Sequence, residues 1–307
     1  MKRSMNYLEL LKITTQIYKS IICFGLDPVI STLHKKFISG GIKGFYDMLE
    51  ELFDYMASQK VAPGAFKPNL GFYSKHGKAK DLNFEGLIVL AKIFDLIELY
   101  FPGMITILDF KKADILKSSE NYMLEGFEFW DADAVTIPPY MGSDSMLPFC
   151  NVPDKASENR GVYVLNLTSN EGKNDFEMLG TTDGSLVYMR VADWIRKNAK
   201  NHIGLGAVVG ATWLTQLEQI AYDYTQGGVE IPLLIPGIGK KSVGGQGGDA
   251  KEVYEALKNA GYDVNLARLN LSSGLTHPWG EKQPAPDDWK EIITDNLFEY
   301  NRITGMA

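Results

Sequence analysis

Short runs of apolar and β-branched residues recur along the chain, and most are followed by a glycine, proline, asparagine or aspartate and then by a helical pattern. There are eight such runs, at residues 20–27, 62–69, 104–110, 133–140, 161–170, 204–212, 231–239 and 264–274. Most are apolar throughout rather than alternating. That pattern is typical of parallel strands covered by helices.

Helical patterns lie between these runs. They cover residues 45–58, 84–100, 185–200, 214–225 and 250–261, and a last helix is expected at 287–303. The most apolar of them, at 84–100, carries Lys92, Asp95 and Glu98 at helical spacing. It therefore reads as an amphipathic helix and not as a membrane span.

Eight strand–helix units without a clear linker predict a (β/α)8 TIM barrel of the α/β class. We expect one domain over residues 1–307, with an N-terminal helix and a C-terminal covering helix. The pattern is weakest at "SDSMLPFC", which gives only a short helix, and in the polar stretch 169–184. A doubly wound sheet is the alternative, and it requires several strands to be misread.

Composition narrows the function classes. The chain has 307 residues, is 45% hydrophobic and carries a net charge of −7. A protein this acidic is not expected to bind nucleic acid, because phosphate neutralisation needs a basic face. Two cysteines, Cys23 and Cys150, make no disulfide framework and fit a reducing cytoplasm. The N-terminus lacks the apolar stretch of a signal peptide, and no membrane partner is expected.

Polar residues gather where the predicted strands end, which is where TIM barrels place their active sites. The third strand gives the densest cluster, in "ITILDFKKADILKSS". Residues two apart on a strand point the same way, so Asp109 and Lys111 are expected to share the barrel mouth. Asp114 follows in the turn, and Lys67 comes from the neighbouring strand. The cluster is either a salt-bridge network that positions loops or a charge array in a pocket, and its place at the mouth favours the second.

The motif D-x-K-x-x-D at 109–114 resembles the signature of the orotidine 5′-phosphate decarboxylase family. Further segments resemble that family in the family's own order, and they are similar to its longer, type 2 subgroup in particular. These segments are "FGLDP" at 24–28, "FKPN" at 66–69, "TSN" at 168–170, "VVGAT" at 208–212, "PGIG" at 236–239 and "GQGGD" at 245–249. The resemblance covers roughly residues 23–274.

The resemblance implies a lyase that decarboxylates orotidine 5′-monophosphate to uridine 5′-monophosphate, the last step of de novo pyrimidine synthesis, without a cofactor. Lys111 then protonates C6, within an alternating charge network of Lys67, Asp109, Lys111 and Asp114. The family places the last aspartate in the site of a neighbouring subunit, so a homodimer sharing Asp114 is implied. No metal is expected, and the four histidines are scattered along the chain.

The resemblance also implies the substrate contacts. Asp27 is expected to hold ribose hydroxyls, Ser169 to contact the pyrimidine ring, and Gln246 to contact the phosphate. The other residues carried over as substrate-binding are Ser118, Thr168, Pro236, Gly237, Gly247 and Ser273.

The phosphate end departs from the family pattern in "PGIGKKSVGGQGGDAKEV" and in "NLSSG". The first segment joins a glycine-rich loop to a helix start at Asp249, which is typical of an anion site. However, "KKSVGG" is inserted there, and Ser273 stands where the family usually has a phosphate-binding arginine. We hypothesise that Lys240 or Lys241 supplies the missing charge. Arg268 is a weaker candidate because it lies within a strand.

Two other function classes remain open at this point. One is a different phosphosugar enzyme on the same barrel, such as a hexulose-phosphate synthase or a pentulose-phosphate epimerase, which typically needs a divalent metal. The other is a degenerate barrel that binds a nucleotide without turnover, which the missing arginine suggests. The complete charge array argues against the second, because buried charges are costly to keep without a role.

Overall fold

Eight parallel strands form the centre of the molecule. The computed structural model describes residues 5–151, 159–240 and 245–306. Along the sheet the strands follow the order β2-β1-β8-β7-β6-β5-β4-β3. Their bounds are β1 Ile22–Leu26, β2 Ala65–Pro68, β3 Ile107–Leu108, β4 Ala134–Ile137, β5 Gly161–Leu167, β6 Leu205–Val209, β7 Leu233–Ile235 and β8 Ala267–Leu271.

Backbone hydrogen bonds between β2 and the residues on either side of β3 close this sheet into a barrel. The N–H of Phe66 donates to the carbonyl of Ile105 at 2.9 Å, and the N–H of Asp109 donates to the carbonyl of Pro68 at 3.0 Å. The chain is therefore a (β/α)8 TIM barrel, as the sequence predicts. A doubly wound open sheet, the alternative, is wrong because its two edges would not meet.

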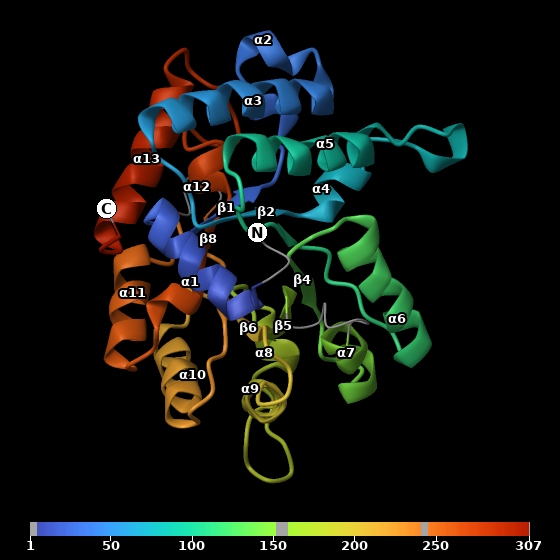
Figure 1. The fold of residues 1–307 in the computed structure, drawn as a ribbon, viewed down its shortest axis with the longest axis vertical. Helices are drawn as coiled ribbons and strands as arrows, with labels where there is room; N and C mark the ends of the chain where they lie inside the picture. Colours follow the sequence, from blue (N-terminus) through green and yellow to red (C-terminus); the bar gives the residue numbers. More distant parts are fainter. Residues whose placement is uncertain (1–4, 152–158, 241–244, 307) are drawn as a thin grey trace.

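Helices surround the strands on all sides (Figure 1). They are α1 Tyr7–Tyr18, α2 Lys35–Ile38, α3 Gly41–Gln59, α4 Leu70–Ser74, α5 Glu85–Tyr100, α6 Leu116–Leu124, α7 Ser143–Cys150, α8 Lys173–Phe176, α9 Val187–Asn198, α10 Leu214–Gln226, α11 Ala250–Asn259, α12 Ser273–Thr276 and α13 Trp289–Ile303. Within the described residues, no helix is long and apolar enough to cross a membrane.

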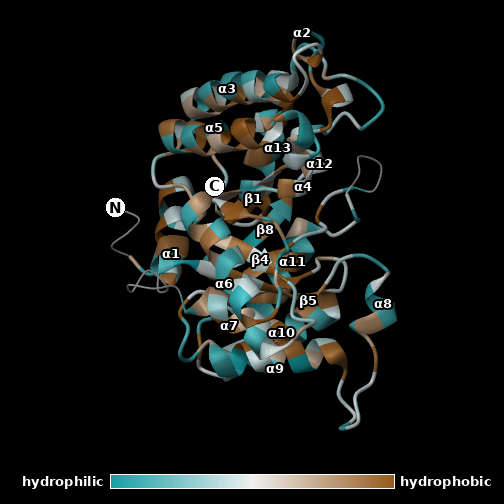
Figure 2. Ribbon diagram, turned by 90° about the vertical axis from the view of Figure 1, so that its right-hand side faces the viewer, coloured by the Kyte–Doolittle hydropathy of each residue, from teal (hydrophilic) through white to brown (hydrophobic). Residues whose placement is uncertain are grey.

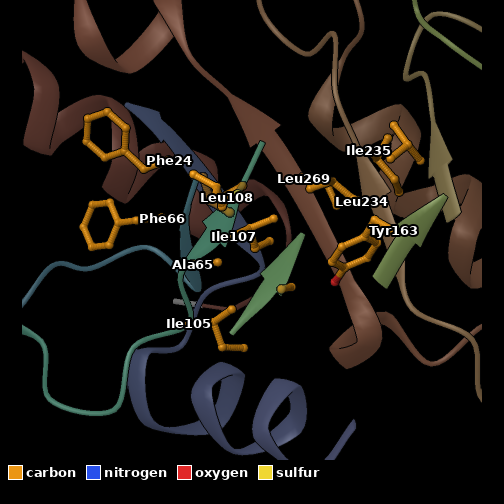
Figure 3. Close-up of a cluster of buried hydrophobic side chains, with 14 of the residues drawn as sticks. Phe24, Ala65, Phe66, Ile105, Ile107, Leu108, Tyr163, Leu234, Ile235 and Leu269 are labelled. Carbon is orange, nitrogen blue, oxygen red and sulfur yellow. The ribbon is translucent and has the colours of Figure 1, made fainter. Parts of the chain in front are cut away.

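The core lies between these helices and the strands, and hydrophobic and hydrophilic residues alternate along the outer helices (Figure 2). Phe24 and Phe66 lie side by side in Figure 3 and stack with ring centroids 5.8 Å apart. Phe66 also packs on Phe53 of α3. Because neighbouring residues on a strand point to opposite faces, burying Phe66 under α3 turns Lys67 into the barrel.

Helix α1 closes the end of the barrel where the strands begin. The guanidinium of Arg268, fully buried in β8, donates to the carbonyl of Leu11 at 2.8 Å and to Oγ1 of Thr14 at 2.7 Å. Nearby, the hydroxyl groups of Tyr7 and Tyr163 lie 3.1 Å apart. Arg268 therefore links α1 to the barrel, and its guanidinium N–H groups are bound at this end.

Some elements differ from the sequence expectation. The third strand is only Ile107–Leu108, and the first part of the expected eighth strand is the 3-10 turn Val264–Leu266. Helix α6 and the π-helical turn Glu125–Phe129 that continues it have a weak apolar stripe and were not predicted. The short helix α7 is confirmed, and the polar stretch 169–184 contains the short helix α8.

Candidate active site

A cavity of about 300 Å³ opens at the carboxyl ends of the strands. Every strand or the loop after it contributes to its wall, as expected for this fold. Its polar lining residues are Asp27, Lys67, Asp109, Lys111, Thr136, Thr168, Ser169, Asn170, Gln246, Asn270, Ser272 and Ser273. A larger hollow of about 940 Å³ lies elsewhere, between α4, α5 and α6, and is lined by none of the charged residues of this cavity.

The carboxylate of Asp109 is the centre of the cavity's charge network. Nζ of Lys67 donates to its Oδ2 at 2.7 Å, and Nζ of Lys111 forms an ion pair with its Oδ1. The side chains of Lys67 and Asp109 are 5% and 8% exposed, whereas that of Lys111 is 46% exposed. The buried pair thus supports a second ammonium that faces the open part of the cavity.

The ionisation states of the buried pair follow from opposing influences. Burial, the largest influence on each group, opposes its charged form. For Asp109 the neighbouring Lys67 and Lys111 outweigh burial and hold the pKa of the carboxyl well below its usual range. For Lys67 the charges of Asp109 and Asp27 outweigh burial and raise the pKa of the ammonium above its ordinary value. Both groups are therefore charged at neutral pH.

The backbone of Lys111 is unusual, because its φ of +48° lies in the left-handed region. A non-glycine residue there costs about 1–2 kcal/mol. Lys111 lies three residues beyond the end of β3, so the strand alternation used in the sequence analysis does not strictly apply. The turned backbone nevertheless brings its side chain back to Asp109.

Sequence reasoning missed Thr136 of β4. Its side chain is buried and lines the cavity, and Oγ1 donates to Oδ1 of Asp109 at 2.8 Å. Strand alternation alone would have turned Thr136 inward with Ala134, but a threonine in a strand gives no catalytic signal. Asn270 and Ser272 were also missed as lining residues.

Asp114 and Ser118 do not line the cavity of their own chain. The carboxylate of Asp114 accepts the N–H of Ile115 at 2.7 Å, and the N–H of Ser118 donates to the carbonyl of Ile115. The structure therefore brings together three of the four expected charges, Lys67, Asp109 and Lys111. Lys112, the residue after Lys111, pairs with Glu125 at 2.6 Å outside the cavity.

Asp27 and the loop after β5 line the cavity as the sequence predicts. Oδ1 of Asp27 accepts the N–H of Asn69 at 3.3 Å. Thr168 donates its N–H and its hydroxyl to Glu177, each at 2.7 Å, which fixes the start of the loop. Ser169 approaches Gly237 so closely that a Cβ on that glycine would lie 2.8 Å from the Cβ of Ser169.

The loop after β7 forms the other end of the cavity, with Pro236, Gly237, Gln246 and Ser273 in its wall. Gly247 lines a neighbouring cavity of about 630 Å³ instead. Asp249 is the N-cap of α11, as expected, but its carboxylate accepts the N–H groups of Lys251 and Glu252 at 2.8 and 3.0 Å. These two amides are therefore not available to an anion.

The candidate cations for this end are differently placed. Lys240 is exposed and does not line the cavity. Lys241 lies outside the described residues. Arg268 is held at the opposite end of the barrel, beneath α1, so it does not serve this end.

Comparisons with known proteins agree with this geometry. The family described as Orotidine 5′-phosphate decarboxylase / HUMPS matches residues 20–267. An orotidine 5′-phosphate decarboxylase of Cupriavidus necator is 35% identical over 281 residues, which are 91% of this chain and 92% of that protein.

Two solved structures from Leishmania donovani are similar over nearly the whole chain. An OMP decarboxylase has 25% identity and a TM-score of 0.68, with 99% of this chain and 100% of that chain covered. A UMP synthase has 28% identity and a TM-score of 0.70, with 98% of this chain covered. This chain spans 57% of the UMP synthase.

The buried pair predicts a pH dependence of stability. We expect Asp109→Asn to lower the free energy of unfolding at pH 7 by about 3–5 kcal/mol, because Lys67 is left as an uncompensated buried charge. The pKa of Asp109 is lowered by folding, and its unfolded value is about 3.9. Its contribution is therefore present above about pH 4 and is lost as the pH falls below that value.

Urea unfolding of both proteins between pH 7 and pH 3 measures this. The gap between wild type and Asp109→Asn should stay constant down to about pH 4 and then narrow. As a control, Asp81→Asn removes an exposed partner of Lys78 and should change stability little. Equal stabilities at pH 7, or a gap that does not change down to pH 3, would contradict the prediction.

Proposed function

This chain belongs to the orotidine 5′-phosphate decarboxylase / HUMPS family, and we propose that it uses Lys111 to protonate C6 as orotidine 5′-monophosphate loses CO2. It is a carboxy-lyase, and its product is uridine 5′-monophosphate. The observation that carries the proposal for Lys111 is the network in which Asp109 joins buried Lys67 to Lys111 at the cavity mouth.

The reaction needs such a network because loss of CO2 leaves a carbanion on an sp² carbon. A fixed ammonium beside that carbon stabilises the developing charge and then supplies the proton. Asp109 holds Lys111 in place, while Lys67 keeps Asp109 ionised. Removing water around these groups strengthens each interaction. An aspartate facing the substrate carboxylate would also disfavour the bound ground state.

The substrate then extends from Lys111 across the cavity. We assign Asp27 to the ribose hydroxyls and Ser169 to the pyrimidine ring, as the family resemblance implies, because both line the cavity. The phosphate is assigned to the end formed by the loop after β7. The residues proposed there, with Thr168 beside them, are Pro236, Gly237, Gln246, Gly247 and Ser273.

We further propose a homodimer with shared sites. Asp114 and Ser118 do not reach their own cavity, so their assigned roles require the cavity of a second copy. Ile115 and Leu116, in the same segment, are 61% and 58% exposed, and Phe129 of the π-helical turn is 73% exposed. Adjacent exposed apolar side chains such as Ile115 and Leu116 are typical of an interaction surface.

At the phosphate end, we propose that Lys240, Lys241 or both replace the arginine that the family usually has at position 273. Ser273 is neutral, and Lys240 follows the Pro236–Gly239 turn that forms this end of the cavity. The N–H of Gly245 donates to the carbonyl of Lys240 at 3.0 Å, so the insertion begins and ends beside the cavity. The alternative is that both lysines are solvated.

Three further assignments complete the proposal. A cytoplasmic location is inferred from Cys23 and Cys150, which are free and buried. The single-domain assignment for residues 1–307 and the type 2 subgroup stay predictions. The degenerate nucleotide-binding barrel, which Ser273 suggests from the sequence, is not favoured by the family match and the named relatives. Within the described residues, no group of three or more His, Cys, Asp or Glu residues could hold a metal ion.

Turnover of orotidine 5′-monophosphate tests the proposed reaction directly. In the presence of a chelator, the wild-type protein should convert it, and Lys111→Ala should lose about 100- to 10,000-fold in kcat because the positioned acid is gone. Lys112→Ala is the matched control, since its ammonium pairs with Glu125 outside the cavity, and it should keep the wild-type rate. Ultraviolet absorbance of the pyrimidine follows the reaction.

The outcomes separate the alternatives. Activity that a chelator abolishes would point to a metal-dependent relative. A folded wild-type protein that binds uridine 5′-monophosphate without turnover would be the degenerate barrel. A fully active Lys111→Ala variant would remove Lys111 from the mechanism.

The proposal that Lys240 or Lys241 replaces the phosphate-binding arginine predicts a change in KM. Removing the charge with Lys240→Ala and Lys241→Ala, singly and together, should raise KM about 10- to 100-fold if a charged contact is lost. Lys251→Ala, which removes an exposed lysine of α11, is the control. If KM is unchanged in the double variant, the lysines do not replace the arginine.

Shared sites predict complementation between two inactive variants. Lys111→Ala and Asp114→Ala should each be nearly inactive, but a mixture should recover activity as subunits exchange. Half of the dimers are then mixed, and each has one intact site, so recovery reaches about one quarter of the wild-type rate. A mixture as inactive as its components, although sedimentation shows mixed dimers, would place Asp114 in its own chain's site or outside the mechanism.

A further inference from the structure

We propose that Thr136 is a positioning residue that holds Lys111 against Asp109 through a single hydroxyl group. Thr136 lies in β4, is 1% exposed and lines the cavity. The expected effect on turnover rests on the proposed function, whereas the effect on the position of Lys111 does not. The test below keeps the two apart.

The hydroxyl of Thr136 makes two hydrogen bonds whose directions are determined. The backbone N–H of Lys111 lies 3.3 Å from Oγ1 and can only donate, so Oγ1 accepts there. The hydroxyl proton is then free for Oδ1 of Asp109, which is 2.8 Å away and can only accept. One hydroxyl group therefore joins the backbone of Lys111 to the carboxylate that its own side chain binds.

These contacts form a closed ring. It runs from the N–H of Lys111 to Oγ1 of Thr136, on to Oδ1 of Asp109, and back through Nζ of Lys111. The ring fixes both ends of the lysine, its backbone and its ammonium. It also sets the rotation of the Asp109 carboxylate, since Oδ2 is already bound by Lys67.

Lys111 needs such a restraint because little else holds it. It lies beyond the end of β3, its side chain is 46% exposed, and its φ of +48° is one that a lysine rarely adopts. Strand β3 itself has only two residues and pairs with β4 at two positions. Thr136 extends the link between β4 and the chain after β3 up to the residue that carries the ammonium.

Strand β4 provides a fixed backbone position from which Thr136 can hold Lys111. Thr136 is paired with Tyr163 of β5 within a continuous four-residue register, so its backbone is fixed from the other side. A catalytic group is best held by residues whose own positions are locked by packing and hydrogen bonds. Thr136 meets that condition.

The chain offers a closely matched control at the other end of the barrel. Oγ1 of Thr106 accepts the N–H of Asp133 at 3.4 Å and donates to Oδ2 of the same residue at 3.0 Å. This buried threonine therefore also joins a backbone amide to a carboxylate. It does not line the cavity.

The experiment compares Thr136→Val, Thr136→Ser and Thr106→Val with the wild type, by steady-state turnover of orotidine 5′-monophosphate and by crystal structures. Thr136→Val should lower kcat about 100-fold with little change in KM, because a small displacement of the acid affects the transition state and not the bound substrate. Thr136→Ser keeps the hydroxyl and should keep most of kcat. Thr106→Val should lower the melting temperature and leave kcat unchanged.

The crystal structures provide a readout that does not depend on turnover. In Thr136→Val, Lys111 should leave its left-handed backbone conformation or its ion pair with Asp109, whereas Thr136→Ser should retain both. If the wild type does not turn over this substrate, the proposed function fails and the structures alone decide the positioning role. Unchanged geometry of Lys111 in Thr136→Val, or a kcat no lower than that of Thr106→Val, would overturn the proposal.

Discussion

The buried carboxylate of Asp109 is the group on which the rest of the site depends. Without cations around it, a carboxylate in this position would take up a proton. With Lys67 on one oxygen and Lys111 on the other, it stays ionised and becomes the anchor for both. Lys67, in turn, tolerates burial only because Asp109 and Asp27 are near. The buried charges of Asp109 and Lys67 thus depend on each other, so the two groups form as a unit.

The barrel makes that unit possible by separating two tasks along each strand. Residues facing the helices, such as Phe66, supply apolar burial, and the next residue, Lys67, faces inward without weakening it. Stability at the opposite end comes from α1 and Arg268. The mouth can therefore hold buried charges, although burying such charges by itself disfavours folding. Glycine is needed where a neighbouring side chain crowds a strand, since a Cβ on Gly25 would lie 2.0 Å from Oγ of Ser272.

The sequence predicts the barrel and the inward positions of Lys67 and Asp109, because strand periodicity and the strand-end rule are local properties. It does not predict contacts made between distant residues. Thr136 is 27 positions from Asp109, and its hydroxyl gains a role only when β3 and β4 are side by side. The left-handed Lys111 carries no glycine or asparagine signal. At Asp249 the helix start suggests an anion site, but an N-cap aspartate binds the free amides itself.

The two ends of the cavity differ in a way that bears on the mechanism. The end with Lys111 has every charge that one chain can supply, while the end with Ser273 has a neutral residue where the family usually has arginine. Binding energy at a remote phosphate helps to hold the reacting carbon in place, so losing it reduces kcat as well as affinity. If the phosphate contact were lost, the charge network would still disfavour folding but would contribute little to the catalytic rate. Retention of the network therefore argues that a cation reaches the phosphate from another position, and the inserted lysines are the nearest candidates in the sequence.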